Sequence, residues 1–282
     1  MTSLPELLVI GHVTRDLFPG ENRLGGAASF STRAAAMLGI QTALVTAAPP
    51  DFSLLAPLKG LSNVSLHIVP SQTVTTFEVD YSGPRRRLYL REVARPIRIE
   101  DIPVAWRGIP VAYVAPVAGE CDRALVDGLS AKLICAGFQG WLRRSGADQR
   151  VEPAITPEAL EPPRGLNAIV FSEEDHPEGE FMAEQLAQKE LLVALTRGRK
   201  GSTLRKGSQR WDISAAPAHE VDPTGAGDVF GIALTLALAR GASPQEAARV
   251  ASEIAARVVE GPELGKLTAA DAAHLPPRAR TP

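Results

Sequence analysis

Apolar residues occur along the chain in short runs that alternate with longer segments of helical periodicity. The predominantly apolar runs lie at residues 7–10, 42–46, 64–69, 111–115, 132–136, 168–171 and 191–195. Short runs of this kind, with little polar alternation, are typical of parallel strands that are buried on both faces. Because helical segments separate them, the pattern predicts an α/β protein with a doubly wound, mostly parallel sheet and helices on both faces.

One segment departs from this pattern. Residues 73–92 alternate between polar and apolar side chains and are interrupted by Ser82-Gly83-Pro84, which predicts a β-hairpin outside the main sheet. Three arginines, Arg85, Arg86 and Arg87, crowd its tip. They are either solvated charges or a clamp for a phosphate that is already on a substrate.

Composition narrows the classes of function. A chain of 282 residues can hold one large α/β domain, and its net charge of −2 offers no general attraction to nucleic acid or to an anionic membrane, so we expect neither partner. Two cysteines, Cys121 and Cys135, are too few for a disulfide framework and are interpreted as free thiols of a reducing compartment. The first ten residues lack the features of a signal peptide, and no apolar run approaches the roughly 20 residues of a membrane span. We therefore expect a cytoplasmic protein.

The most informative stretch is D-P-T-G-A-G-D-V-F at residues 222–230, which runs into an unbroken apolar segment at 231–239. The segment predicts a buried helix, so a loop of small residues opens onto a helix N-terminus, where free N–H groups and the helix dipole favour an anion. The expected donors of this anion hole are the N–H groups of Gly225, Ala226 and Gly227. Asp228 falls in the first helical turn. There it is either a helix-stabilising acid or a base that takes a proton from a hydroxyl during phosphoryl transfer.

This stretch resembles the C-terminal motif of the ribokinase-like (PfkB) carbohydrate kinases. The pair Gly25-Gly26, followed by small residues and a helix that ends at Leu38-Gly39, resembles the first motif of the same family. Many members continue that motif with an asparagine that grips the sugar, whereas Phe30 stands there in this chain and favours a flatter polyol. Gln139 lies in a G-F-Q-G stretch that is similar to the D-x-Q-G of the myo-inositol kinase branch, so we expect it to contact the substrate.

The resemblance implies one ribokinase-like domain over residues 1–272, with a β-lid from about residues 12–24 and 73–92. The lid would cover the substrate and exclude water, and we expect a homodimer, if one forms, to use it. Asp16 follows the first strand, at the sheet edge where α/β proteins bind ligands, and is a candidate acceptor contact together with Gly25 and Gly26. The proline- and arginine-rich tail at 273–282 is expected to be disordered.

The resemblance also implies ATP and Mg²⁺ as cofactors. The expected nucleotide contacts are Thr196, Gly198, Gly201, Thr224, Gly225 and Gly227. The family carries N-x-x-E where this chain has Ser172-x-x-Asp175, so Asp175 or its neighbour Glu174 would hold Mg²⁺ through water; the alternative is an acidic first turn of a helix. Asp222 would brace the anion loop or, as in some relatives, help to ligate a monovalent cation.

These observations predict an ATP-dependent phosphotransferase that phosphorylates a hydroxyl of a small sugar or polyol, with a myo-inositol-like acceptor favoured and Asp228 as the general base. A phosphosugar kinase or a nucleoside kinase of the same fold is an alternative. A non-catalytic, ligand-binding regulatory relative is the alternative from another class. The altered residues Phe30, Ser172 and Asp175 support it, but a pure binding protein would have no use for the base of the intact G-A-G-D.

Overall fold

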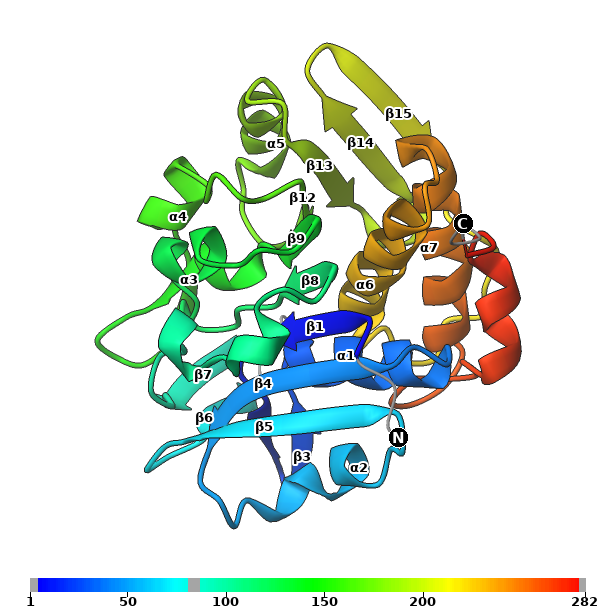
Figure 1. The fold of residues 1–282 in the computed structure, drawn as a ribbon. Coiled ribbons are helices and arrows are strands. Elements are labelled where there is room, and N and C mark those ends of the chain that lie inside the picture. Colours follow the sequence, from blue (N-terminus) through cyan, green and yellow to red (C-terminus); the bar gives the residue numbers. More distant parts are fainter. Residues whose placement is uncertain (1–4, 81–86, 279–282) are drawn as a thin grey trace.

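The computed structural model describes residues 5–80 and 87–278, and its centre is a nine-stranded sheet in the order β15-β14-β13-β12-β9-β8-β1-β4-β5 (Figure 1). Seven strands run parallel: β1 (Leu7–Ile10), β4 (Thr42–Ala48), β5 (Val64–Pro70), β8 (Val111–Val114), β9 (Leu133–Gly137), β12 (Ala168–Ser172) and β13 (Leu192–Thr196). At one edge, β14 (Ser202–Lys206) and β15 (Gln209–Ile213) add an antiparallel hairpin. The predicted α/β class is confirmed, since each apolar run became a strand of this sheet.

Helices cover both faces of the sheet (Figure 1). One core cluster packs the sheet against α1 (Ala27–Met37), α6 (Ala226–Ala239) and α7 (Pro244–Val258). The other packs it against α3 (Arg123–Asp127), α4 (Pro157–Leu160) and α5 (Gly179–Ala187), while α2 (Ala56–Lys59) lies beside β5. Residues 229–237 of α6 are all buried, which explains why its sequence carries no polar stripe. Short 3₁₀ helices lie in the connections, at Ser53–Leu55, Ile99–Asp101, Val104–Trp106, Gln139–Trp141, Gly198–Lys200 and Ala269–His274.

A second, four-stranded sheet has the order β3-β2-β6-β7. Its strands are β2 (Thr14–Phe18), β3 (Glu21–Gly25), β6 (Thr75–Asp80) and β7 (Arg87–Glu92). The predicted hairpin is present as β6 and β7; Arg85 and Arg86 of its tip lie outside the described residues, and Arg87 begins β7. Asp16, which follows β1 in the sequence, lies on β2, because residues 14–18 pair with β3 and residues 14–17 also pair with β6.

A short hairpin that the sequence did not predict packs beside this second sheet. It consists of β10 (Arg143–Ser145) and β11 (Val151–Pro153). The N–H of Leu90 on β7 donates to the carbonyl oxygen of Gln149 at 2.8 Å, and Tyr89 forms a β-bridge with Arg150. Residues from the middle of the chain are therefore joined to the second sheet through β7.

The end of the chain packs on the domain through residue 278, although composition predicted disorder from residue 273. Leu275 is buried, and the guanidinium of Arg240 donates to the carbonyl oxygen of Pro276 at 2.8 Å. Arg278 pairs with Glu6 at 3.0 Å, which brings the two ends of the described chain together. The burial of one leucine and two arginine contacts thus hold this segment on the domain despite its polar composition. Residues 279–282 lie outside the described residues. No helix within the described ranges is both long and apolar enough to cross a membrane.

Candidate active site

The predicted functional residues gather where the parallel strands end. Asp228, in the first turn of α6, lies close enough to Asp16 on β2, Asp175 after β12 and Arg143 on β10 for their charges to act on it. Parallel strands place all their carboxyl ends at one edge, so loops that are distant in sequence meet there. The structure thereby brings together three of the acids that the sequence singled out.

Glycine is required at the start of α6 for two reasons. Gly225 caps the helix in the left-handed conformation, with φ of 79°, which residues with a side chain rarely adopt. A Cβ at this position would also lie 2.4 Å from Cδ1 of Phe30. Phe30, a predicted substrate contact, is only 8% exposed, and its ring lies against the loop.

Hydrogen bonds brace the loop before the helix. Asp222 Oδ1 accepts the N–H of Thr224 at 2.9 Å, and the N–H groups of Val221 and Asp222 donate to the carbonyl oxygen of Val259 after α7. Asp222 therefore braces the loop, as predicted. The N–H of Ala226, an expected donor of the anion hole, donates instead to the carbonyl oxygen of Pro223 at 3.1 Å and closes a turn. A Cβ on Gly227 would meet nothing within 4 Å, so the helix end is open at that point.

Asp228 is poised near neutral pH. Although Asp228 keeps some exposed surface, its carboxyl is enclosed by the surrounding protein, and this burial raises its pKa to about 7. Arg143 lowers this pKa, and the negative charges of Asp175 and Asp16 raise it further. The dipole at a helix N-terminus favours an ionised carboxylate, but here the loss of water outweighs it. A base whose pKa lies near the working pH is well suited to take a proton from a hydroxyl.

Asp16 and the glycine pair are in direct contact. The hydroxyl of Thr14 donates to Asp16 Oδ1 at 2.6 Å, and a Cβ on Gly25 would lie 2.1 Å from Asp16 Oδ2. A Cβ on Gly26 would lie 2.6 Å from the carbonyl oxygen of His12. Because these two glycines lack a Cβ, the backbone just before α1 can lie close to Asp16 and to His12.

Gln139 and Asp175 form one hydrogen-bonded chain. Gln139 Nε2 donates to Asp175 Oδ1 at 3.0 Å, and Gln139 Oε1 accepts from Arg143 Nη2 at 2.8 Å. The second oxygen of Asp175 accepts the N–H of Ser172 at 2.8 Å. Gln139, which the sequence assigned to the substrate, and Asp175, which it assigned to the metal, are therefore joined by a hydrogen bond.

The Asp175 region fits a hydrated Mg²⁺. Each oxygen of its carboxylate accepts a hydrogen bond and keeps further lone pairs. The exposed Glu174 lies beside it, and its N–H donates to the hydroxyl of Ser172 at 3.2 Å. Mg²⁺ keeps several waters and needs only one or two carboxylates beside donor phosphates. Among the residues that the structure describes, no three His, Cys, Asp or Glu side chains form a metal cage. A metal here would therefore depend on water and on the phosphates of the donor.

The turn at residues 196–201, called the donor turn because it carries the expected nucleotide contacts Thr196, Gly198 and Gly201, begins at the end of β13. The hydroxyl of Thr196 donates to the carbonyl oxygen of Phe171 at 3.3 Å, and the N–H of Arg197 donates to Gly201 across the turn at 2.8 Å. A Cβ on Gly201 would lie 2.0 Å from the carbonyl oxygen of Ile213, so this position also requires glycine.

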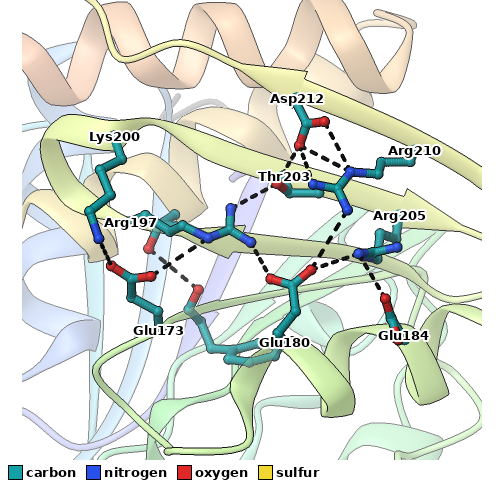
Figure 2. A network of polar contacts seen from close by, with 11 residues as sticks. Glu173, Glu180, Glu184, Arg197, Lys200, Thr203, Arg205, Arg210 and Asp212 are labelled. Carbon is teal, nitrogen blue, oxygen red and sulfur yellow. Dashed lines mark hydrogen bonds and ion pairs between the residues drawn. The ribbon is translucent and has the colours of Figure 1, made fainter.

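The basic side chains of this turn form ion pairs with acidic side chains, and Figure 2 shows those of Arg197 and Lys200. Arg197 pairs with Glu173 and Glu180, and Lys200 pairs with Glu173 at 3.2 Å. Glu173 follows β12 and Glu180 belongs to α5, so these contacts join the turn to the α5 face of the sheet. Arg199 pairs with Glu220, just before the anion loop, at 3.1 Å. These ion pairs hold the turn in place, with Thr196 and the backbone of its glycines, Gly198 and Gly201, at the end of β13.

Residues 165–269, which include the anion loop and the donor turn, match the family model described as pfkB family carbohydrate kinase. This part of the chain, residues 165–269, therefore carries a pfkB-family carbohydrate kinase domain. It is 27% identical over 281 residues to the inositol 3-kinase of Oryza sativa subsp. japonica, an alignment that covers 90% of this chain and 68% of the rice protein. The inositol 3-kinase of Zea mays is 26% identical, with 90% of this chain and 72% of the maize protein covered. The protein is thus a carbohydrate or polyol kinase, as the motifs predicted.

Solved structures confirm the ribokinase-like fold of this kinase. A pyrophosphate-dependent kinase of the ribokinase family, solved with a pyrophosphate analogue and myo-inositol, superposes with a TM-score of 0.78 at 18% identity, over 95% of this chain and 99% of that one. A sugar kinase from Pyrococcus horikoshii in complex with ATP has a TM-score of 0.74 at 19% identity, over 95% and 99% of the two chains.

Sequence reasoning missed two residues that interact with Asp228, Arg143 and Tyr113. Tyr113 on β8 is fully buried, and a Cβ on Gly231 of α6 would lie 2.1 Å from its hydroxyl oxygen. Burial raises the pKa of Tyr113 well above its ordinary value, and the charge of Asp228 adds to the shift, so the phenol stays protonated. A polar-tipped aromatic residue within an apolar strand was the available signal for Tyr113; Arg143 had none, because its hairpin shows no alternation.

Proposed function

We propose that this kinase phosphorylates a hydroxyl of a neutral cyclic polyol of the myo-inositol type, with Asp228 as the general base. The observation that carries the proposal is the charge around Asp228: among the residues that the structure describes, the carboxylates of Asp16 and Asp175 and the guanidinium of Arg143 act on it. Such surroundings repel an acceptor that already bears phosphate. They suit an acceptor rich in hydroxyl groups, which donate hydrogen bonds to carboxylates. The similarity to plant inositol 3-kinases supports the same acceptor class.

In the proposed reaction, an acceptor hydroxyl lies beside Asp16 and Asp228. Its proton passes to Asp228 as the oxygen forms a bond to the terminal phosphorus of ATP, and the bond from that phosphorus to ADP breaks. The open N-terminus of α6, at Gly225 and Gly227, stabilises the negative charge of the transferring group. Bound Mg²⁺, near Asp175, would neutralise charge on the donor phosphates.

The test is a panel of acceptors assayed with the whole protein. With MgATP, we expect kcat/KM for myo-inositol to exceed the values for ribose, fructose, fructose 6-phosphate and inosine by at least about tenfold, an advantage of about 1.4 kcal/mol in transition-state binding. A preference for the sugar phosphate or the nucleoside would overturn the acceptor assignment. A parallel series uses pyrophosphate as donor, because one structural neighbour is pyrophosphate-dependent. Turnover with pyrophosphate alone would overturn ATP as the donor and leave the acceptor assignment standing.

Asp228→Asn tests the base. The amide keeps the size of the side chain but cannot accept the proton, so kcat should fall by about 10²–10⁴-fold while ATP affinity stays within a few-fold. Turnover near the wild-type rate would exclude Asp228 as the base.

A further inference from the structure

Arg143 reaches the site from an element that belongs to the lid. It is the first residue of β10, and the β10–β11 hairpin pairs with β7 through Leu90 and Gln149. Arg91 of β7 reinforces this contact, since its Nη1 donates to Gln149 Oε1 at 2.6 Å. Any displacement of the lid would therefore be transmitted to Arg143.

The guanidinium of Arg143 makes two contacts that join separate parts of the site. Its Cζ lies 5.4 Å from the ring centre of Phe77 on β6, a cation–π contact with the lid. Its Nη2 donates to Gln139 Oε1 at 2.8 Å, and Gln139 in turn donates to Asp175. A planar guanidinium can make both contacts at once, through its face and through its edge.

Arg143 is also the positive charge that acts on Asp228. The other groups that face Asp228 are Asp16 from β2, Asp175 after β12 and the neutral phenol of Tyr113 from β8. Both carboxylates raise the pKa of Asp228, as burial does, and Arg143 opposes them. Removal of this charge would leave the base protonated over more of the neutral range.

We propose that Arg143 is a positioning residue of the phosphoryl-transfer site, which links the lid to Gln139 and balances the carboxylates around Asp228. The proposal rests on the proposed function, because it takes Asp228 as the base. It assigns the short β10–β11 hairpin a part in the reaction: the hairpin delivers the balancing charge only when the lid is seated. A purely structural Arg143 would affect stability without altering the protonation of the base.

The decisive experiment compares the pH dependence of kcat/KM for R143Q, R143K and a matched control, R144Q. Arg144 is the next residue of β10 and is exposed, so its loss removes the same charge outside the site. We expect the acidic limb of wild type near pH 7 to move upward by about one pH unit in R143Q, the size expected for loss of a nearby opposite charge, and to stay in place in R144Q. R143K should return the limb toward wild type but raise the KM for myo-inositol, because an ammonium cannot reproduce the planar contacts with Gln139 and Phe77. An acidic limb in R143Q that coincides with that of R144Q would overturn the proposal.

A second readout does not depend on turnover. In protein labelled with ¹³C at the aspartate carboxyls, Asp228→Asn identifies the Asp228 signal, whose pKa should be higher in R143Q than in wild type and R144Q. If R143Q does not fold, R143M keeps an apolar side chain over Phe77 and removes the same charge. An unchanged Asp228 titration in the folded neutral variant would refute the proposal. If no acceptor is phosphorylated at all, the proposed function fails, and this titration still decides the electrostatic role of Arg143.

Discussion

The ring of Phe30 lies directly against Gly225, and a Cβ on Gly225 would stand 2.4 Å from Cδ1 of that ring. The two residues belong to helices at opposite ends of the sequence, α1 and the cap of α6. Their contact sets the path of the anion loop, because the loop can pass over the ring only where it has no side chain. Phe30, which belongs to the first glycine motif, thus helps to shape the anion loop of the second motif at Gly225.

Gly225→Ala should destabilise the protein. The left-handed φ of 79° costs a residue with a side chain about 1–2 kcal/mol, and the clash with Phe30 adds to that cost. Gly227→Ala is the matched control, because its Cβ would meet nothing within 4 Å. Alanine at this helical position should leave the free energy of unfolding unchanged or raise it by up to about 1 kcal/mol. Equal losses in urea unfolding of the two variants would contradict the loop geometry.

The stability of wild type should fall as the pH rises through neutrality. The folded pKa of Asp228 is about 7, above its ordinary value of 3.8, so the stability contributed by the protonated group is complete below pH 3.8 and is lost as the pH rises through 7. Asp228→Asn removes this dependence. The melting temperature of the variant, relative to wild type, should therefore be higher at pH 8 than at pH 5. A constant difference across that range would show that the carboxyl titrates normally.

Gly231 and Tyr113 should be energetically coupled. In Gly231→Ala the new Cβ would lie 2.1 Å from the hydroxyl oxygen and 3.0 Å from Cζ of Tyr113, an overpacking that typically costs about 1–3 kcal/mol. Tyr113→Phe removes the closest atom and should restore part of this loss when the two changes are combined. Chemical denaturation of both single variants and the double variant gives the coupling. Strict additivity would mean that the phenol does not occupy the space beside Gly231.

Two arginines of the network in Figure 2 should differ in their effect on stability. Arg205 is 14% exposed and pairs with Glu180 at 2.6 Å and with Glu184 at 3.0 Å, whereas Arg210 is 47% exposed. Arg205→Gln should cost about 1.5–3 kcal/mol, because the largely buried guanidinium makes charged contacts with two carboxylates. Arg210→Gln should cost no more than about 1 kcal/mol. The order of the two free energies of unfolding, measured at 0.15 M salt, decides the prediction; the reverse order would contradict it.

The lid should respond to the acceptor. Amides of β6 and β7 should gain hydrogen-exchange protection when myo-inositol and a non-hydrolysable ATP analogue are bound, whereas β13, in the core of the main sheet, should be protected throughout. Equal protection of the lid with and without ligands would make it a fixed part of the fold and not a gate.

The fold could be predicted almost completely because its signals are local. Unbroken apolar runs at residues 7–10, 168–171 and 191–195 are typical of central strands, and the sheet confirms each of them. The hairpin at residues 73–92 was visible from its alternation. The β10–β11 hairpin escaped because three-residue strands are too short to show a period, and they are stabilised by their pairing with β7.

For the site, the sequence by itself determined which groups are available: glycines that permit a left-handed turn, an acid in the first turn of α6, and polar residues after β9, β12 and β13. Only the tertiary structure decided what those groups do. It placed Phe30 against Gly225, joined Gln139 to Asp175 by a hydrogen bond, brought Arg143 near Asp228 and raised the pKa of Asp228 to about 7. The physical reason is that burial and electrostatic interaction depend on distances between segments far apart in the chain, whereas a motif records only the order of residues within one segment.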